Sequence, residues 1–317
     1  MDYPFAIGII KAIEDQLLDR ANYMKLIKTP KADLPATLLA MGYGKGSKDI
    51  SLEALIQTEL QATRTLLDGI TPNPKLTDLF YLVHDAANLK GLYKERLFAS
   101  SRPDTAQIPG AIPFDFLKMA ILDRQTDRLP KHIQPLFQTV ETAIEPVSDN
   151  PRLVSVAIDN ALLGFATRQL RFPKQAAFLA YLKAFIDFQN VLTMERSRCL
   201  GWTIDNAEKM LLENGSIPVS LITQSAILSR EDYLKSLQGY YQEQVTEWLK
   251  KTEGQSAVEK LERGLADLLL EQVKPFRHDA FSLGPIIYYH LKKDAEAMNL
   301  RILMANDDVD LSDLIDY

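Results

Sequence analysis

Three segments of the sequence line up without gaps around an asparagine, and this internal repetition constrains the fold more than any other feature. The segments are Leu76–Leu92, Phe178–Met194 and Ile287–Leu303. Their asparagines, Asn88, Asn190 and Asn299, stand 102 and 109 residues apart, which is close to a third of the 317-residue chain. Self-similarity at a nearly fixed spacing is typical of repeat architectures. The spacing therefore predicts three similar lobes.

Each segment carries an acid three residues before its asparagine. The pairs are Asp85 and Asn88, Asp187 and Asn190, and Glu296 and Asn299. The position after the asparagine is apolar, and so is the position three residues further on. At about 100° per residue these four positions share one helical face, whereas a second apolar pair, twelve and eight residues before the asparagine, points away from it. A helix that is apolar on two sides is packed on two sides, so we expect each segment to be the central helix of its lobe.

The repeated asparagine has two interpretations. As a buried polar group it would bond a neighbouring backbone carbonyl or a helix end, because buried amides require partners. Alternatively, it contacts a partner protein directly, and we favour the structural role. An acidic helix also precedes each repeat, with Glu59, Asp159 and Glu262 in helical patterns.

Apolar residues recur at spacings of three and four along most of the chain, as in Leu52–Leu67 and Val258–Val273. That period is typical of amphipathic helices, and persuasive alternating strands bounded by hairpin dipeptides are missing. The sequence predicts an all-α fold, with its best linker at Ser100–Pro113, which contains three prolines and a glycine. The lobes are predicted to span residues 1–105, 106–210 and 211–317, and the last helix to pack back near the N-terminus.

Composition argues against some classes of function. The formal net charge of −6 disfavours binding to a nucleic-acid backbone, which depends on a positive field. One cysteine, Cys199, cannot form an internal disulfide, so we expect a reducing compartment such as the cytoplasm. Met1–Pro4 lacks the features of a signal peptide, and apolar runs such as Leu153–Ile158 are too short to cross a bilayer. If the protein works at a membrane, we expect another protein to hold it there.

The stretch Gly42–Ser47, with the sequence GYGKGS, invites comparison with a phosphate-binding loop. Such a loop needs G-x-x-x-x-G-K-[ST] between a strand and a helix, whereas here Lys45 precedes Gly46 and the segment follows a predicted helix. We interpret it as a helix C-cap and a flexible loop, since glycine supplies the left-handed conformation there. A mobile loop of this kind would be available to a partner protein.

No other motif indicates catalysis. The four histidines, His84, His132, His278 and His290, are scattered singly and match no zinc-binding spacing. Cys199 has no persuasive catalytic partner, although arginines flank it. The acidic run 307–316 is expected to be a solvated segment, with contact to basic residues on a partner as the alternative. We therefore predict no catalytic residue, no cofactor site and no metal site.

Several of these segments resemble the C-type stalk protein of the V-type rotary ATPases, a family that includes the d-type protein of the eukaryotic enzymes. The run Pro285–Met304 is similar to the last helix of that family, in which a tyrosine-bearing helix leads into an acid and an Asn-Leu-Arg triplet, here Asn299–Arg301. The opening Tyr3–Tyr43 resembles the family's start, including a helix that ends in the paired leucines Leu17 and Leu18. The middle, Arg152–Pro218, resembles its second lobe.

The resemblance covers nearly the whole chain, and the order and spacing of weak motifs carry it. Two departures stand out. Lys90 and Leu192 occupy the repeat positions that hold arginine in the third segment. Lys293 and Asp294 stand where the other two repeats are apolar, so we expect the third lobe to pack differently. The length is similar to that of prokaryotic members.

The resemblance implies a funnel of three helical lobes with pseudo-threefold symmetry and no active site. In this family the funnel is a peripheral component on the cytoplasmic face of the membrane ring of proteolipid subunits. Its cavity receives the tip of the central axle, and it couples rotation of the soluble motor to transport of H⁺ or Na⁺. Closely packed helices deform little, so a rigid helical body suits that mechanical task.

Two other functions remain open from the sequence. One is a cytosolic helical-repeat adaptor that binds other proteins without a rotary motor, because periodic helical arrays serve both purposes. The other is an all-α enzyme that uses buried carboxylates such as Asp159 or Asp187. A pair of carboxyl groups with raised pKa in an open pocket would support the enzyme.

Overall fold

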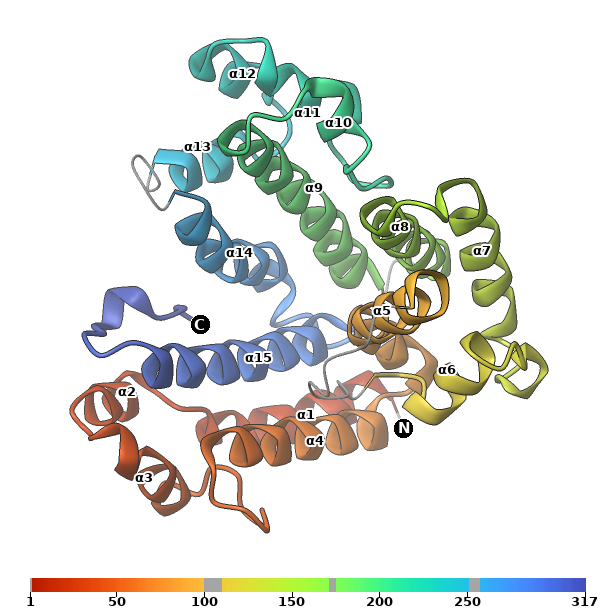
Figure 1. Ribbon diagram of the computed structural model, residues 1–317. Coiled ribbons are helices and arrows are strands. Elements are labelled where there is room, and N and C mark those ends of the chain that lie inside the picture. The colour runs from red at the N-terminus through yellow and green to blue at the C-terminus, as the bar shows by residue number, and fades with distance from the viewer. Residues whose placement is uncertain (1, 100–109, 171–174, 251–256) are drawn as a thin grey trace. The chain divides into compact units, whose positions relative to one another are not determined.

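The computed structural model describes residues 2–99, 110–170, 175–250 and 257–317. Within these ranges the chain forms fifteen α-helices, joined by loops and short 3₁₀ turns, and no strand (Figure 1). The prediction of an all-α fold is therefore confirmed for the described residues. Of the predicted linker Ser100–Pro113, residues 100–109 lie outside the described part, and residues 110–113 are not helical.

The helices range in length from 5 to 25 residues. In the first half of the chain they are α1 (Tyr3–Ile13), α2 (Arg20–Ile27), α3 (Leu34–Ala40), α4 (Leu52–Ile70), α5 (Pro74–Phe98), α6 (Phe114–Ile121), α7 (Gln134–Ile144) and α8 (Pro151–Gln169). In the second half they are α9 (Ala176–Cys199), α10 (Ile204–Glu208), α11 (Val219–Thr223), α12 (Arg230–Ser236), α13 (Gln242–Lys250), α14 (Ala257–Val273) and α15 (Gly284–Ala305). Three of the longest, α5, α9 and α15, contain the repeat segments.

Helix ends follow local chemistry. The α2 helix begins with a capping box, in which the Asp19 carboxylate accepts from the Asn22 N–H and the Asn22 amide oxygen accepts from the Asp19 N–H, at 2.7 and 2.9 Å. The α3 helix ends at Gly42, whose φ is +87°, and the N–H groups of Gly42 and Tyr43 bond carbonyls of the last turn. The predicted C-cap at this glycine is confirmed.

The predicted helix that ends at Leu17 and Leu18 is wrong in its end point. The α1 helix stops at Ile13, and a 3₁₀ turn, Glu14–Gln16, follows it. The two leucines lie beyond both, because the Leu18 N–H bonds a distant carboxylate and the next residue already caps α2. Tertiary contacts decide this boundary.

The chain forms two compact units. Unit 1 gathers the described residues of Met1–Pro74, Phe172–Tyr181 and Glu259–Tyr317, and unit 2 those of Lys75–Arg171 and Leu182–Val258. Segments from the start and the end of the sequence therefore share one unit. The division into three lobes stays a prediction.

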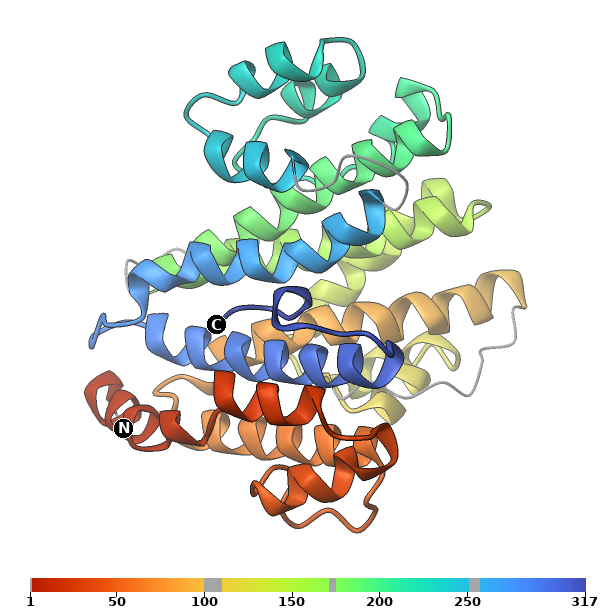
Figure 2. The same ribbon diagram turned by 90° about the vertical axis from the view of Figure 1, so that its left-hand side faces the viewer.

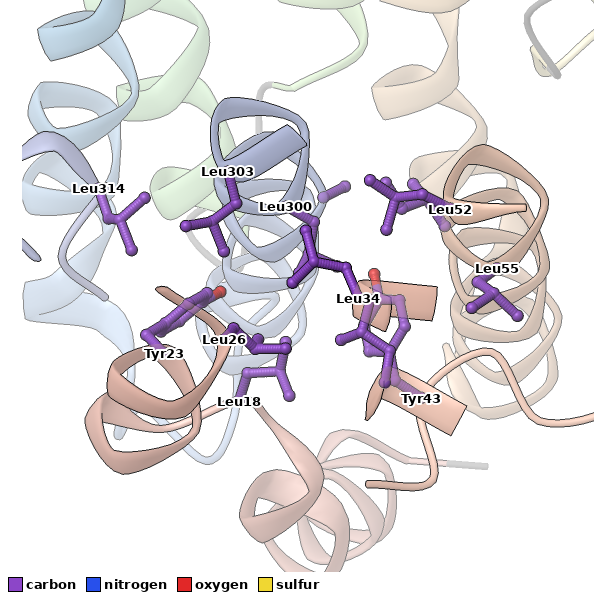
Figure 3. Close-up of a cluster of buried hydrophobic side chains, with 13 residues drawn as sticks. Leu18, Tyr23, Leu26, Leu34, Tyr43, Leu52, Leu55, Leu300, Leu303 and Leu314 are labelled. Atoms are coloured by element: carbon purple, nitrogen blue, oxygen red, sulfur yellow. The ribbon is translucent and has the colours of Figure 1, made fainter. Parts of the chain in front are cut away.

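In unit 1, α1, α4 and α15 lie side by side (Figures 1 and 2). Thirteen buried residues form a core cluster between α15, α4, α3, α2 and the segment after α15. Figure 3 shows leucines of α15 pointing toward Leu26 and Tyr23 of α2, with Leu314 at the edge. Each buried leucine contributes roughly 1.5–3 kcal/mol to stability relative to an exposed one.

In unit 2, α7 packs along α8. The aromatic ring of Phe188 on α9 contacts the rings of Tyr241 and Trp248, with centroids 5.0 and 5.9 Å apart. Offset and edge-on ring pairs of this kind add to the burial energy of large side chains.

Both apolar sets of the repeat segments are buried in α5, α9 and α15. The upstream pairs are Leu76 and Phe80, Phe178 and Leu182, and Ile287 and Leu291; the downstream pairs are Leu89 and Leu92, Val191 and Met194, and Leu300 and Leu303. Each helix is therefore covered on two sides, as the sequence predicts. Among the described helices, none is long and apolar enough to span a membrane.

Candidate functional site

The repeated acid and asparagine of α9 hold one loop by its backbone. The Asn190 amide nitrogen donates to the Leu212 carbonyl at 2.8 Å, and the Leu212 N–H donates to the Asn190 amide oxygen at 2.7 Å. One turn earlier, the Asp187 carboxylate accepts from the N–H groups of Ser216 and Ile217, at 2.9 and 3.0 Å. Both side chains are almost completely buried. We call this arrangement, an acid and an asparagine that bond the backbone of a neighbouring segment, a clamp.

The clamp of α5 uses its acid in the same way. The Asp85 carboxylate accepts from the N–H of Ala111 at 2.9 Å and from that of Ile112 at 3.3 Å. In both clamps the residue before the bonded pair is a glycine that touches the carboxylate. A Cβ atom on Gly110 would lie 1.8 Å from Asp85 Oδ1. A Cβ atom on Gly215 would lie 2.1 Å from the equivalent atom of Asp187, so neither position accepts a side chain without movement.

These glycine loops were not predicted from the sequence, although a signal for them was present. Gly110–Pro113 reads GAIP and Gly215–Pro218 reads GSIP. In each case the proline is followed by a short helix, α6 or α11. The glycine allows the close approach to the acid, the next two residues donate their N–H groups, and the proline begins the turn into the helix.

The clamp of α15 takes its backbone partners from two distant segments. The Asn299 amide nitrogen donates to the Ile315 carbonyl at 3.0 Å, and the Ile315 N–H donates back at 2.8 Å. The Glu296 carboxylate accepts from the N–H of Leu18 at 2.5 Å, across 278 residues of sequence. Leu18 also lies two residues before a helix, as Ile112 and Ile217 do. The same geometry is therefore made without the glycine and proline of the other two loops.

Lys293 distinguishes this third clamp from the others. Its ammonium group donates to Glu296 at 2.9 Å and to Glu59 of α4 at 2.8 Å, and the side chain is only 2% exposed. Glu59 in turn accepts from the Gly44 N–H at 3.1 Å. The corresponding positions in the first two repeats are Leu82 and Ala184. The two carboxylates outweigh the effect of burial and raise the pKa of Lys293 above its usual value.

The acids on the helices that precede the repeats have different environments. Glu59 bonds Lys293 of the third repeat, as described above, and Asp159 of α8 pairs with Lys90 of the first repeat at 2.6 Å. Burial raises the pKa of the Asp159 carboxyl, while Lys90 acts to lower it. Glu262 is exposed. Two of the three acids therefore tie neighbouring helices together.

None of these carboxyl groups is arranged as a catalytic pair. Burial raises the pKa of Asp187 to about 6, although its two N–H donors oppose that shift. Its oxygens face the loop that it holds, and Asp159 is paired with a lysine rather than with a second acid. A cavity of 360 Å³ in unit 2 is lined by Asp159 and Lys90 among mainly apolar side chains. Among the described residues no group of three or more His, Cys, Asp or Glu side chains is placed to hold a metal ion.

The glycine loop Gly42–Ser47 is buried in one half and exposed in the other. Tyr43 and Gly44 are buried, and a Cβ atom on Gly44 would lie 2.8 Å from Leu55. The hypothesis of a mobile partner-binding loop is therefore wrong for Gly42–Gly44, which is fixed by Glu59 and by packing. Lys45 and Gly46 remain on the surface. The loop follows a helix, so the phosphate-loop alternative has no structural support either.

The histidines lie apart from one another where they are described. His290 pairs with Asp294 one turn further along α15 at 3.3 Å, and the Nε2 atom of His278 accepts from Arg277 at 3.0 Å. His132 is exposed, and the side chain of His84 lies outside the described part. Cys199 is exposed at the end of α9.

The acidic run 307–316 is partly structural. Asp307 pairs with Lys31 at 2.6 Å, and Asp310 caps the short 3₁₀ turn Leu311–Asp313. The Asp316 N–H donates to Asp267 of α14 at 3.1 Å. The expectation of a purely solvated segment is therefore wrong, because backbone and side-chain contacts hold it against unit 1.

Comparison with known protein families gives one match. A family model described as "ATP synthase (C/AC39) subunit" matches residues 6–306, which is nearly the whole chain. No curated protein matches the sequence.

Proposed function

The chain belongs to the ATP synthase (C/AC39) subunit family, and on that premise we propose that it is the central-stalk socket of a V-type rotary ATPase or ATP synthase. Members of this family are non-catalytic structural components of the V-type ATPase. The proposed task is to join the axle subunits of the soluble motor to the proteolipid ring in the membrane. Rotation would thereby be coupled to the movement of H⁺ or Na⁺.

The match over residues 6–306 is the observation that carries this proposal. The clamps add physical support, because a part that transmits torque must not deform. Each clamp fixes a loop or segment to the middle of a long helix through a buried side chain that bonds its backbone. Hydrogen bonds to charged groups contribute roughly 1.5–3 kcal/mol each, and an unmade one is costly.

The three-lobed architecture belongs to the same proposal. We expect three similar lobes, approximately 1–105, 106–210 and 211–317, arranged as a funnel with pseudo-threefold symmetry around the axle. The positions Asp85, Asn88, Asp187, Asn190, Glu296 and Asn299 would then be equivalent structural positions of the lobes. The hydrogen bonds of Asn190 and Asn299 to backbone carbonyls support the structural interpretation over direct contact with a partner.

The proposed place of action is the cytoplasmic face of the membrane, where the protein would be peripheral and held by the ring. Its partners would be the axle subunits and the ring, without nucleic acid and without insertion into the bilayer. No cofactor is needed for a mechanical linker.

Calorimetric titration of the purified chain against a purified axle complex tests the proposal. We expect a saturable heat and co-elution as one complex, through an interface of standard size or smaller. The chain alone should be monomeric and should hydrolyse no nucleotide. Absence of heat and of co-elution would contradict the socket and would favour the alternative, a cytosolic helical-repeat adaptor for other proteins.

A further inference from the structure

Residues 306–317 cross unit 1 as a segment with no α-helix of its own. After α15 the chain turns back along that helix (Figure 2). We call residues 306–317 the strap. Two of its apolar side chains, Leu314 and Ile315, are buried at 9% and 6% exposure, and the Ile315 backbone is held by Asn299. The rest of the strap is largely exposed.

The strap also holds a segment from the other end of the sequence. The Tyr317 hydroxyl donates to the Leu18 carbonyl at 2.9 Å, so its second contact, at 2.7 Å, must be a hydrogen bond donated by the Tyr23 hydroxyl. The two tyrosine rings meet edge to face, with centroids 6.2 Å apart. At the opposite end of the strap, Asp307 pairs with Lys31. The strap therefore touches both ends of residues 17–31, which include α2.

Leu18 lies at the centre of this arrangement. Its N–H is bonded by Glu296 of α15, and its carbonyl is bonded by Tyr317 of the strap. In the clamp of α9 the bonded residues follow their helix directly in the chain, whereas residues 17–31 reach α15 only by tertiary contacts. Loss of the strap would leave the Leu18 carbonyl and the Tyr23 hydroxyl without these partners.

Packing beneath the strap is incomplete. A cavity of 560 Å³ lies between Leu311–Tyr317 and the segment that contains Leu18 and Tyr23, with Asp267 of α14 on one side. Few buried apolar contacts and many exposed backbone groups are the features of a region that opens locally at low free energy. The strap combines both.

We propose that residues 306–317 form a releasable strap that locks residues 17–31 against α15, and that the two segments detach together while α4 and α15 stay folded. Detachment would expose the Asn299 and Glu296 side chains and the apolar face of α2 to another polypeptide. The strap would thus be a conformational switch built into unit 1. This inference does not rest on the proposed function, because it concerns the isolated chain.

Hydrogen-exchange mass spectrometry of the full chain tests the proposal, with Tyr317→Phe as the variant. The substitution keeps the ring but removes the donor to Leu18 and the acceptor for Tyr23. Each hydrogen bond contributes about 1 kcal/mol, so exchange should become roughly fivefold to thirtyfold faster in residues 17–31 and 306–317 together. Peptides from α4 and α9 should exchange as in the unchanged protein.

Tyr43→Phe is a matched control in the same unit. The Tyr43 hydroxyl is buried and has no hydrogen-bond partner among the described residues. Its removal should leave exchange in both segments within about twofold, because no bond is lost. This control separates the effect of the Tyr317 bonds from that of any lost tyrosine hydroxyl.

Three outcomes would overturn the proposal. Faster exchange in residues 306–317 alone would mean that the strap does not hold residues 17–31. An equal acceleration through all of unit 1, including α4, would mean that the region opens only by unfolding of the whole unit. No change in either segment would mean that the Tyr317 bonds do not secure the strap.

Discussion

The clamps of α9 and α15 make the same hydrogen bonds but take their backbone partners from different places in the chain. Asp187 bonds Ser216 across 29 residues, whereas Glu296 bonds Leu18 across 278. Closing the longer loop costs about 2 kcal/mol more conformational entropy if no other contact helps. The α15 clamp has compensating contacts that the α9 clamp lacks, since Lys293 neutralises the acid and Tyr317 holds the Leu18 carbonyl.

The comparison shows how one sequence pattern serves two physical purposes. Around α9 the acid and asparagine shape a local loop, which glycine and proline have already predisposed to turn. Around α15 they bring together three parts of the sequence that have no local reason to meet. Breaking the second arrangement should therefore cost more than breaking the first.

The largest effect is expected for Lys293→Met. Removal of the ammonium group leaves Glu59 and Glu296 buried or half-buried without their cation, and breaking such a buried pair costs about 3–5 kcal/mol. Urea denaturation followed by circular dichroism measures the loss. The double variant Lys293→Met with Glu296→Gln should recover part of it, because one uncompensated charge is removed. A loss below about 1 kcal/mol would show that the ion pairs do not stabilise the α15 clamp.

Asn190→Leu and Asn299→Leu compare the two clamps directly. Each variant leaves one backbone N–H and one carbonyl without its partner, which should cost about 2–4 kcal/mol. Asn190→Leu should lower the melting temperature without selectively abolishing binding to axle subunits. Unchanged melting with lost binding would reassign Asn190 to partner contact.

Asp187 gives the α9 clamp a pH dependence. Its folded pKa of about 6 exceeds the unfolded value, so the folded state binds more protons between about pH 4 and 6. Stability due to this group therefore falls as pH rises through that window, by about 1–3 kcal/mol.

Asp187→Asn provides the reference, because asparagine does not titrate. The variant should be less stable than the unchanged protein at low pH, since its amide nitrogen faces a backbone N–H, and the gap should narrow as pH rises toward 7. Denaturation curves of both proteins between pH 4.5 and 7.5 measure it. A gap that stays constant would contradict the raised pKa.

The smallest effect is expected for Arg301→Leu, which gives the third repeat the residue that the second has at Leu192. Arg301 makes two hydrogen bonds to Glu53, at 2.7 and 3.1 Å, but the two side chains are 44% and 57% exposed. Pairs this exposed contribute only about 0.2–1 kcal/mol. A larger loss in thermal denaturation, at both low and high salt, would show that this pair is more than a screened surface contact.

Local patterns in the sequence were enough for the helical part of the fold. Apolar spacing predicted the helices, and the alignment around the asparagines found α5, α9 and α15 with both of their buried faces. The loop sequences GAIP and GSIP carried the positions of two clamp partners, but the role of the glycine became clear only when the carboxylate was seen against it. The ends of α1 and the contacts of the acidic run were predicted wrongly, because distant residues bond them.

The sequence by itself determined that the chain is helical, that one helix pattern occurs three times, and that each copy buries an acid and an asparagine. Those properties depend on residues three or four positions apart, which share a helix face whatever the rest of the chain does. Only the tertiary structure decided which backbone each acid and asparagine would hold, and that Lys293 would lie between two carboxylates. A buried polar group must find a partner, but the partner is whichever group packing brings within about 3 Å, and no local period records that.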